Sequence, residues 1–493
     1  MNKKLEIKDI SPTEVSSAKL FNPSQDIAAK TARAQNKSAH QQDLYQAREK
    51  IYRKLVSGTF QRIREVTIWL TLSVYFLGPW LTWNGRQALL FDLPERKFYI
   101  FGFTFWPQDF VLLSWLLIIS AFTMFFVTAL AGRVYCGYAC PQTVWTHVFV
   151  WIEKFTEGDR NKRIKLDAQE LTANKFLRKS LKHCLWLIVA FATAFTFVGY
   201  FQPIKELTLD VLYIEVHGWA LFWLGFFTLA TYGNAGWMRE QVCMYMCPYA
   251  RFQSAMFDKD TLIVTYDEKR GEPRGKRKKS EDIKASGKGD CINCQLCVQV
   301  CPTGIDIRNG LQYECITCAA CIDACDMMMD QVGYDRGLIR YSTEHAMEGG
   351  KTHILRPRLI GYGLFLLVMM SAFSYVFLTR VPLELDIIRD RNQLYRETST
   401  GLIENTYTLK IMNMTQSENH YVITMNGVEG LDLNAPDTIR ALPGELVVVP
   451  VSAALAPEDI EKPNTTVTFS VESTVYPEQR VVQESRFIAP LKL

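Results

Sequence analysis

The chain has 493 residues, of which 48% are hydrophobic and 22% are charged, and its mean hydropathy is near zero. It is too apolar to be disordered as a whole and too charged to lie entirely in a membrane, so we expect a multi-domain protein with membrane and soluble parts. The 55 basic and 51 acidic residues leave a net charge of +4, too small to indicate a nucleic-acid partner, and none is predicted. All 13 cysteines lie between Cys136 and Cys325, which places any thiol chemistry in the middle of the chain.

Residues 1–65 are polar and lack the apolar core of a secretory signal peptide, so they are predicted to form a cytoplasmic tail. Five uncharged apolar stretches follow, each of about 20 residues and long enough to cross a hydrocarbon core of about 30 Å. Five such runs are improbable for buried helices of a soluble protein, so we predict five transmembrane α-helices. They cover residues 66–85, 110–132, 184–204, 216–238 and 359–379; the first four belong to a membrane domain over residues 66–250, and the fifth occupies 358–380.

Basic residues set the predicted orientation. The tail before the first stretch holds 13 Lys and Arg and segment 141–183 holds nine, while the loops on the other side hold few. By the positive-inside rule the N-terminus is cytoplasmic and the C-terminus lies on the outer side. A further basic run at 269–279 is interpreted as a solvated linker beside the membrane, with a surface for anionic lipid or nucleic acid as the alternatives.

One cysteine pattern, Cys-x3-Cys-Pro, follows both the second and the fourth apolar stretch; its members are Cys136, Cys140 and Pro141, and Cys243, Cys247 and Pro248. If each helix continues past the membrane surface, the i, i+4 spacing puts both sulfurs on one face, and Pro ends or kinks the helix beyond them. Both stretches run inward, so the four thiols are expected at one cytoplasmic boundary. Thiolates are soft ligands that select Cu(I), zinc or iron–sulfur clusters, and Met244 and Met246 are weaker thioether candidates. The alternative is that these are ordinary buried cysteines with no ligand, which the repetition of the Cys-x3-Cys-Pro pattern disfavours. His147 is a weak candidate for an additional ligand.

The strongest motif lies in segment 251–357. The spacing Cys-x2-Cys-x2-Cys-x3-Cys occurs twice, and in bacterial ferredoxins it lets three thiolates hold one iron–sulfur cube while the fourth reaches the neighbouring one. We therefore predict a cytoplasmic α+β ferredoxin domain with two [4Fe-4S] clusters. The first set is Cys291, Cys294, Cys297 and Cys325, and the second is Cys315, Cys318, Cys321 and Cys301. Structural zinc and disulfides are the alternatives, disfavoured by the spacing and by a reducing compartment. Asp326 stands where this motif usually has Pro, which affects only the local turn.

Beyond residue 380 the pattern changes to short segments of alternating polarity, separated by Gly, Pro, Asn and Asp. This alternation predicts a small β-sandwich over residues 381–493, on the outer face of the membrane. Because it has no cysteine, we expect a docking or structural role.

Taken together, these features resemble the cytochrome c oxidase accessory proteins, the CcoG/FixG/RdxA family. The resemblance rests on the five-stretch layout, the two Cys-x3-Cys-Pro elements, the terminal β-sandwich and the string Cys301-Pro-Thr-Gly-Ile-Asp-Ile-Arg-Asn-Gly-Leu-Gln-Tyr-Glu-Cys315. It extends over nearly the whole chain from about residue 60.

The resemblance implies a multi-pass protein of the bacterial inner membrane that serves the assembly of cbb3-type cytochrome oxidase by reducing Cu(II) to Cu(I). It implies an immunoglobulin-like periplasmic domain, two [4Fe-4S] clusters and a copper ion as cofactors, and oxidase assembly factors or a copper transporter or chaperone as partners. In this reading the catalytic, copper-binding residues are Cys136, Cys140, Cys243 and Cys247.

Two other functions stay open: an electron-transfer subunit that feeds a quinone or another membrane reductase, and a non-enzymatic copper-binding scaffold. No GxGxxG pattern follows a predicted strand, so the electron donor is expected to be another protein or a quinol.

Overall fold

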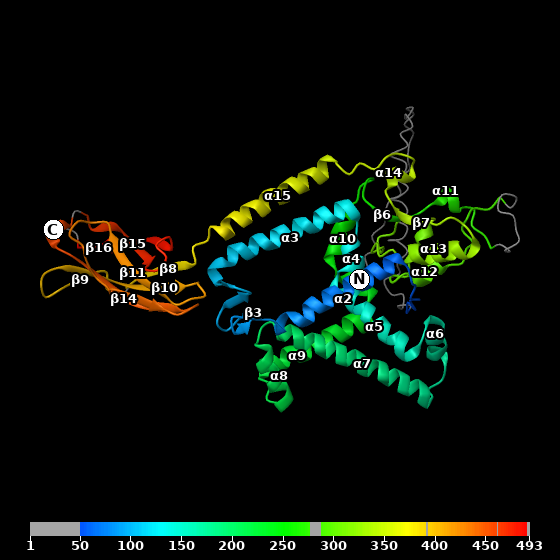
Figure 1. The fold of residues 1–493 in the computed structure, drawn as a ribbon, viewed down its shortest axis with the longest axis horizontal. Coiled ribbons are helices and arrows are strands. Elements are labelled where there is room, and N and C mark those ends of the chain that lie inside the picture. Colours follow the sequence, from blue (N-terminus) through cyan, green and yellow to red (C-terminus); the bar gives the residue numbers. More distant parts are fainter. Residues whose placement is uncertain (1–49, 277–286, 391–392, 461, 491–493) are drawn as a thin grey trace, which may run out of the picture.

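The computed structural model describes residues 50–276, 287–390, 393–460 and 462–490. Most of the predicted tail at 1–65 and part of the basic run at 269–279 therefore lie outside the described residues. Figure 1 shows an elongated molecule with a β-domain at one end, long helices in the middle and the cysteine-rich domain at the other end.

Three helices of the described part are long and apolar enough to cross a membrane: α3 (Phe110–Ala131), α7 (Ala173–Val198) and α15 (Pro357–Leu378). A fourth span results if α8 (Ile204–Tyr213) and the helix Gly218–Met238, which meet at 91°, count as one. This last helix consists of α9 (Gly218–Thr231) and a π-helical turn, η3 (Tyr232–Met238). The number of five spans stays a prediction.

The helix expected at 66–85 differs from the prediction. It is α2 (Thr59–Leu77), which carries three charged residues in its first two turns, Arg62, Arg64 and Glu65. It ends where Gly78 and Pro79 start a short 3-10 turn, because proline cannot continue the hydrogen-bond ladder. Antiparallel strands follow where the sequence indicated helix or loop: β1 (Thr82–Trp83), β2 (Arg86–Gln87), β3 (Leu89–Asp92), β4 (Lys97–Ile100) and β5 (Phe103–Phe105).

The long helices pack in pairs through aromatic side chains. Helix α3 runs beside α15 (Figure 1), and the rings of Phe122 and Phe365 lie 4.3 Å apart. Helix α7 packs on α9, where Phe197 and Phe227 are also 4.3 Å apart. Only 11% of the apolar window of α3 or α15 is buried, so both helices present apolar faces that suit a lipid environment.

The cysteine-rich domain is built on a short antiparallel sheet of β6 (Ile263–Tyr266) and β7 (Ile339–Ser342) with the helices α12 (Leu296–Val300) and α13 (Ala320–Val332). The first turn of α2 is attached to it, because the backbone amides of Phe60 and Gln61 donate to the buried carboxylate of Asp323. The domain is thereby held at the ends of the helices.

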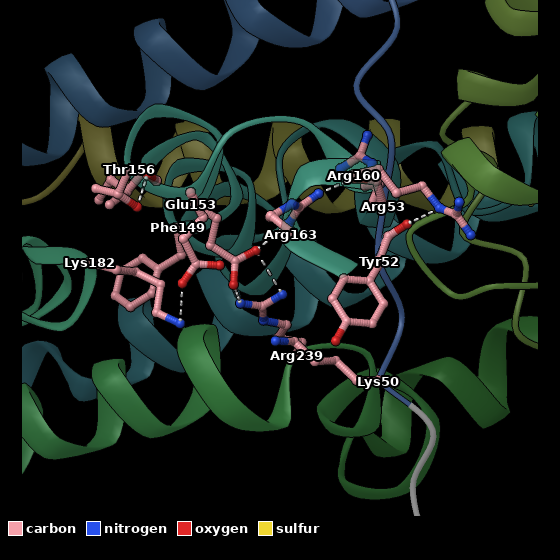
Figure 2. Close-up of polar contacts among 12 residues, drawn as sticks. Lys50, Tyr52, Arg53, Phe149, Glu153, Thr156, Arg160, Arg163, Lys182 and Arg239 are labelled. Carbon is pink, nitrogen blue, oxygen red and sulfur yellow. Dashed lines mark hydrogen bonds and ion pairs between the residues drawn. The ribbon is translucent and has the colours of Figure 1, made fainter. Parts of the chain in front are cut away.

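A buried ionic network joins this domain to the helices (Figure 2). Glu153 of α5 (Pro141–Glu157) accepts from Arg163 of α6 (Arg160–Ala168) and from Arg239, each at 2.6 Å. Arg163 also donates to the carbonyl of Arg53, whose side chain reaches the carbonyl of Val300 in the cysteine-rich domain at 3.2 Å. The extended segment that contains Arg53 therefore connects the cysteine-rich domain to helix α6.

The C-terminal domain is a sandwich of two antiparallel sheets, as the alternation predicts. One sheet has the order β12-β14-β10-β8, with β9 beside β10, and the other has the order β13-β11-β15-β16. Alternate residues of β10 enter the core, where Tyr407 packs edge-on against Phe469 at 5.0 Å. The strands are β8 (Leu383–Arg389), β9 (Arg396–Glu397), β10 (Ile403–Asn413), β11 (Asn419–Asn426), β12 (Asp432–Asn434), β13 (Ile439–Ala441), β14 (Leu446–Leu455), β15 (Asn464–Ser473) and β16 (Arg480–Ile488).

Candidate functional site

Two cavities of the cysteine-rich domain gather its thiols into two sets. One is lined by Cys291, Cys294, Cys297 and Cys325. The other is lined by Cys301, Cys315, Cys318 and Cys321, and Cys297 lines it too. Apart from Cys297, which lines both, each cavity contains the three nearby cysteines of one motif and the last cysteine of the other. This lining is compatible with the crossed ligand sets, whose assignment to two clusters stays a prediction.

The two cysteine loops share an unusual backbone. In the first, Asn293 and Gln295 flank Cys294 with φ of 52° and 57°; in the second, Thr317 and Ala319 flank Cys318 with φ of 51° and 57°. Non-glycine residues rarely adopt this left-handed conformation, which costs of order 1–3 kcal/mol each and persists where surrounding structure or a ligand enforces it. The matching conformations curve both loops around their cavities.

The thiols of these cavities suit a metal cluster and little else. Burial raises the pKa of Cys297, Cys315 and Cys325 to about 12, so their thiolates need a positive partner. In the described part of the chain no three thiols lie within 4.8 Å of one another, a wide spacing that suits thiolates bound to different irons of one cluster. The residues therefore fit [4Fe-4S] cubes, which would supply one-electron chemistry.

The Cys-x3-Cys-Pro elements do not continue the membrane helices, contrary to the prediction. Helix α3 ends at Gly132, with φ of 60°, and η3 ends at Arg239, with φ of 45°. Cys136 lies in the short helix α4 (Val134–Tyr138) and Cys243 in the π-helical turn η4 (Val242–Met246). Cys140 and Cys247 are the N-caps of α5 and α10 (Pro248–Ala255). Each proline is the first residue of a new helix, where its missing N–H leaves no hydrogen bond unmade.

These four thiols are nevertheless near enough to affect one another electrostatically, although no three of them lie within 4.8 Å. Burial raises the pKa of Cys136 to about 11 and that of Cys243 to about 12, and repulsion from Cys140 and Cys247 adds to both shifts. The thiol of Cys136 is 3.3 Å from the Oε1 of Gln253, which is fully buried. Half-buried thiols in such an arrangement favour a soft cation.

The weaker candidates for metal ligands are exposed, half-buried or surrounded by other groups. The side chain of Met246 is 59% exposed, and Met244 is half-buried. His147 is buried, but the charged groups that lower its pKa, besides burial, are Arg53 and Arg64 rather than any cysteine. Cys184, the thirteenth cysteine, is exposed on α7.

The two thiol regions touch directly, which sequence reasoning missed. A Cβ on Gly137 would lie 2.8 Å from the Cα of Cys318 and from the carbonyl of Ile316. Beside this contact the amide of Arg133 donates to the hydroxyl of Thr317 at 2.9 Å. The glycine next to Cys136 was the only local signal, since a close approach of two backbones often needs one.

Models of known families match three parts of the chain. A 4Fe-4S dicluster domain matches residues 238–344, and a 4Fe-4S binding domain matches residues 113–161, which include Cys136 and Cys140. The IG-like fold at the C-terminus of FixG matches residues 373–490. The predicted ferredoxin-type and immunoglobulin-like domains are confirmed.

Curated relatives match most of the chain. Protein RdxB of Cereibacter sphaeroides is 39% identical over 426 residues, covering 84% of this chain and 88% of the relative. Nitrogen fixation protein FixG of Rhizobium meliloti is 38% identical over 424 residues, covering 78% and 80%. A crystal structure of a FixG-related protein from Vibrio parahaemolyticus is 35% identical and covers 22% of this chain and 98% of that one, with a TM-score of 0.21. The chain therefore belongs to the FixG, RdxA and RdxB family of iron–sulfur electron-transfer proteins.

Proposed function

We propose that this protein is a cupric reductase of the bacterial inner membrane, which produces Cu(I) for the assembly of cbb3-type cytochrome oxidase. The ferredoxin domain would face the cytoplasm and the IG-like domain the periplasm. Its partners would be oxidase assembly factors or a copper transporter or chaperone. The step transfers one electron from a reduced iron–sulfur cluster to Cu(II), and no covalent bond of the chain is broken.

The observation that carries this proposal is the contact of Gly137 with the loop of Cys318. It sets Cys136 against the apolar cluster that contains Cys318 and Cys321, so the second cluster cavity and the membrane-edge thiols are neighbours. Thiolates stabilise Cu(I) relative to Cu(II), so four thiols at this place would favour the product of the step.

The test uses the purified full-length protein with its clusters loaded and reduced under anaerobic conditions. Cu(II) is added with a Cu(I)-specific chelator, and chelated Cu(I) and cluster absorbance are followed together. We expect Cys243→Ser and Cys247→Ser to lose Cu(I) production while iron content is unchanged. Cys184→Ser is the matched control, because this thiol is exposed on α7. Wild-type rates in both Cys243→Ser and Cys247→Ser would refute the proposal.

A second candidate function is favoured by one comparison. The 4Fe-4S binding domain matched at residues 113–161 includes Cys136 and Cys140, so the membrane-edge thiols would hold a further cluster and pass electrons to a quinone or another membrane reductase. Iron analysis separates the two functions: about eight irons per chain fit two clusters, and about twelve fit three. Cluster oxidation by a quinone without copper would support this second function.

A further inference from the structure

Three ligand groups from distant parts of the sequence meet where the ferredoxin domain joins α3 and α15. Asp260 lies in the loop after α10, His345 in the helix α14 (Glu344–Met347), and His353 in the segment before α15. The Nδ1 atoms of His345 and His353 lie 3.2 and 3.7 Å from the Oδ1 of Asp260. Among the described residues this is the one group of three or more Cys, His, Asp or Glu whose ligand atoms all lie within 4.8 Å.

These separations are close to those of ligands around one ion. Ligand atoms at about 2.0–2.2 Å from a metal are about 3.0 Å apart at right angles and about 3.4 Å apart in a tetrahedron. A hydrogen bond between Asp260 and His345 alone would explain the first distance, but not why a second imidazole, that of His353, stands beside them. The two rings are 5.3 Å apart and tilted by 66°, so their nitrogens converge on the carboxylate rather than stack.

The backbone fixes all three groups in place. The amide of His353 donates to Asp260 Oδ1 at 3.0 Å, and the amide of His345 donates to the carbonyl of Lys259 at 3.1 Å. Arg356 holds the carbonyl of Asp260 at 2.8 Å, while its own charge is paired with Asp258 at 3.0 Å. The nearby ammonium of Lys259 faces Glu344 and Glu348 at 3.7 and 3.8 Å, so the negative charge of Asp260 is left for the imidazoles or a cation.

The group is open to solvent, and its loop is bound to the end of α3, the helix that precedes Cys136 in the sequence. The side chains of Asp260, His345 and His353 are 15%, 38% and 63% exposed, so an ion could enter and exchange. The same loop binds the end of α3, since Thr261 donates to the carbonyl of Ala129 at 3.0 Å. Four residues beyond α3 and its glycine stop is Cys136.

We propose that Asp260, His345 and His353 form a binding site for a divalent first-row metal ion, and that its ligand in this protein is Cu(II) before reduction. Imidazole and carboxylate ligands suit Cu(II), which binds such sites more tightly than the other divalent ions of this series, whereas thiolates suit Cu(I). The two sites would then match the two oxidation states of the substrate. The Cu(II) role rests on the proposed reductase function; the site itself does not.

The experiment titrates Cu(II) into the full-length protein with its clusters oxidised, so that they hold no electron to give, and follows binding by electron paramagnetic resonance. We expect one Cu(II) signal with nitrogen hyperfine structure, weakened at least tenfold in affinity by His345→Ala or His353→Ala and lost in the double variant. Asp260→Asn should weaken binding while it keeps the shape of the loop. His420→Ala, an exposed histidine of the β-domain, is the control and should bind as wild type does.

Activity separates this inference from the proposed function. We expect the double histidine variant to need at least tenfold more Cu(II) for half-maximal Cu(I) production, with an unchanged maximal rate. Unchanged Cu(II) binding in the double variant, at wild-type iron content, overturns the site. Normal binding in a wild-type protein that makes no Cu(I) supports the site and refutes the reductase. If the double variant loses Cu(II) binding but its Cu(I) production needs no more Cu(II) than that of wild type, the site does not hold Cu(II) before reduction.

Discussion

Gly137 is the residue at which the two thiol regions meet. It stands beside Cys136 in the helix α4, and the backbone of the Cys318 loop occupies the space that a side chain would need. Backbone atoms cannot move aside as the end of a flexible side chain can. The absence of a Cβ at this one position therefore sets how closely the membrane-edge thiols approach the second cluster cavity.

Gly137→Ala should separate the two sites. The added methyl group would lie 2.8 Å from the Cα of Cys318, so we expect α4 to shift and stability to fall by about 1–3 kcal/mol. Cluster oxidation by Cu(II), followed by stopped-flow absorbance, should be slower while iron content stays the same. Gly225→Ala in α9 is the matched control, since a Cβ there meets nothing within 4 Å. Equal oxidation rates in Gly137→Ala and wild type would count against electron transfer through this contact.

At the scale of elements, the ends of helices were harder to predict than their cores. Apolar length located α3, α9 and α15, but the first helix ends at Leu77 and not at residue 85, because Gly78 and Pro79 stop it. Helix α7 begins at Ala173 and not at 184, because Thr172 caps it by accepting from the amide of Lys175 at 3.2 Å. Hydropathy does not register a cap or a stop.

Prolines of the cysteine elements show the same limit. The spacing predicted that each proline would end or kink a helix beyond its cysteine pair, but Pro141 and Pro248 begin helices instead. The chain turns earlier, at Gly132 and Arg239, both of which have positive φ. Arg239 adopts this conformation while its guanidinium binds the buried Glu153, a tertiary contact that no local pattern contains.

Glu153 ties three elements, α5, α6 and the end of η3, through Arg163 and Arg239 (Figure 2). Glu153→Gln would leave two buried guanidinium groups without their counter-charge, so we expect a loss of roughly 3–5 kcal/mol in the free energy of unfolding. Thermal unfolding followed by circular dichroism measures it. Glu95→Gln is the control, because its pair with Lys97 is 65% exposed at the carboxylate and should change stability by under about 0.5 kcal/mol. Equal losses in the two variants would contradict a structural role for the network.

The same carboxylate should make stability depend on pH. Burial alone would raise the pKa of Glu153, but Arg239 and Arg163 outweigh it and lower the pKa below the usual 4.5. A carboxyl with a depressed folded pKa contributes stability above its unfolded pKa, and that contribution is lost as the pH falls through the folded value. The difference in melting temperature between wild type and Glu153→Gln should therefore be constant from pH 7 to 5 and shrink below about pH 4.5. A difference that grows on acidification would contradict this sign.

At the scale of the whole molecule, short sequence patterns predicted the features whose residues are close in sequence. They could not predict the sites that form when distant segments come into contact. The cysteine sets and the strands of the sandwich follow from short patterns. The group of Asp260, His345 and His353 could not be found in this way, because Asp260 is 85 and 93 residues from its partners. The contact of Gly137 with Cys318 joins two motifs that were each recognised, but whose distance no spacing encodes.

The IG-like domain is attached to the membrane part by an ion pair and a small apolar contact. Arg380, just after α15, binds Asp109 at the start of α3 at 2.6 Å, and these side chains are 19% and 12% exposed. The amide of Met414 donates to the carbonyl of Pro382 at 3.1 Å, and Met414 packs with Met412 on Trp106. The domain core itself lies entirely within the sandwich.

Arg380→Ala should therefore loosen the domain without unfolding it. The variant loses the ion pair and leaves Asp109 without its partner, so we expect the free energy of local opening at this junction to fall by about 1.4 kcal/mol. This corresponds to roughly tenfold faster amide exchange at residues 380–385 and 412–416. Hydrogen exchange followed by mass spectrometry measures this, and exchange in β15 should not change. Arg396→Ala is the control, since this arginine is 64% exposed in its pair with Glu404. Because the domain has no cysteine, Cu(I) production should equal that of wild type; a parallel loss of Cu(I) production would instead place the IG-like domain in the electron or copper route.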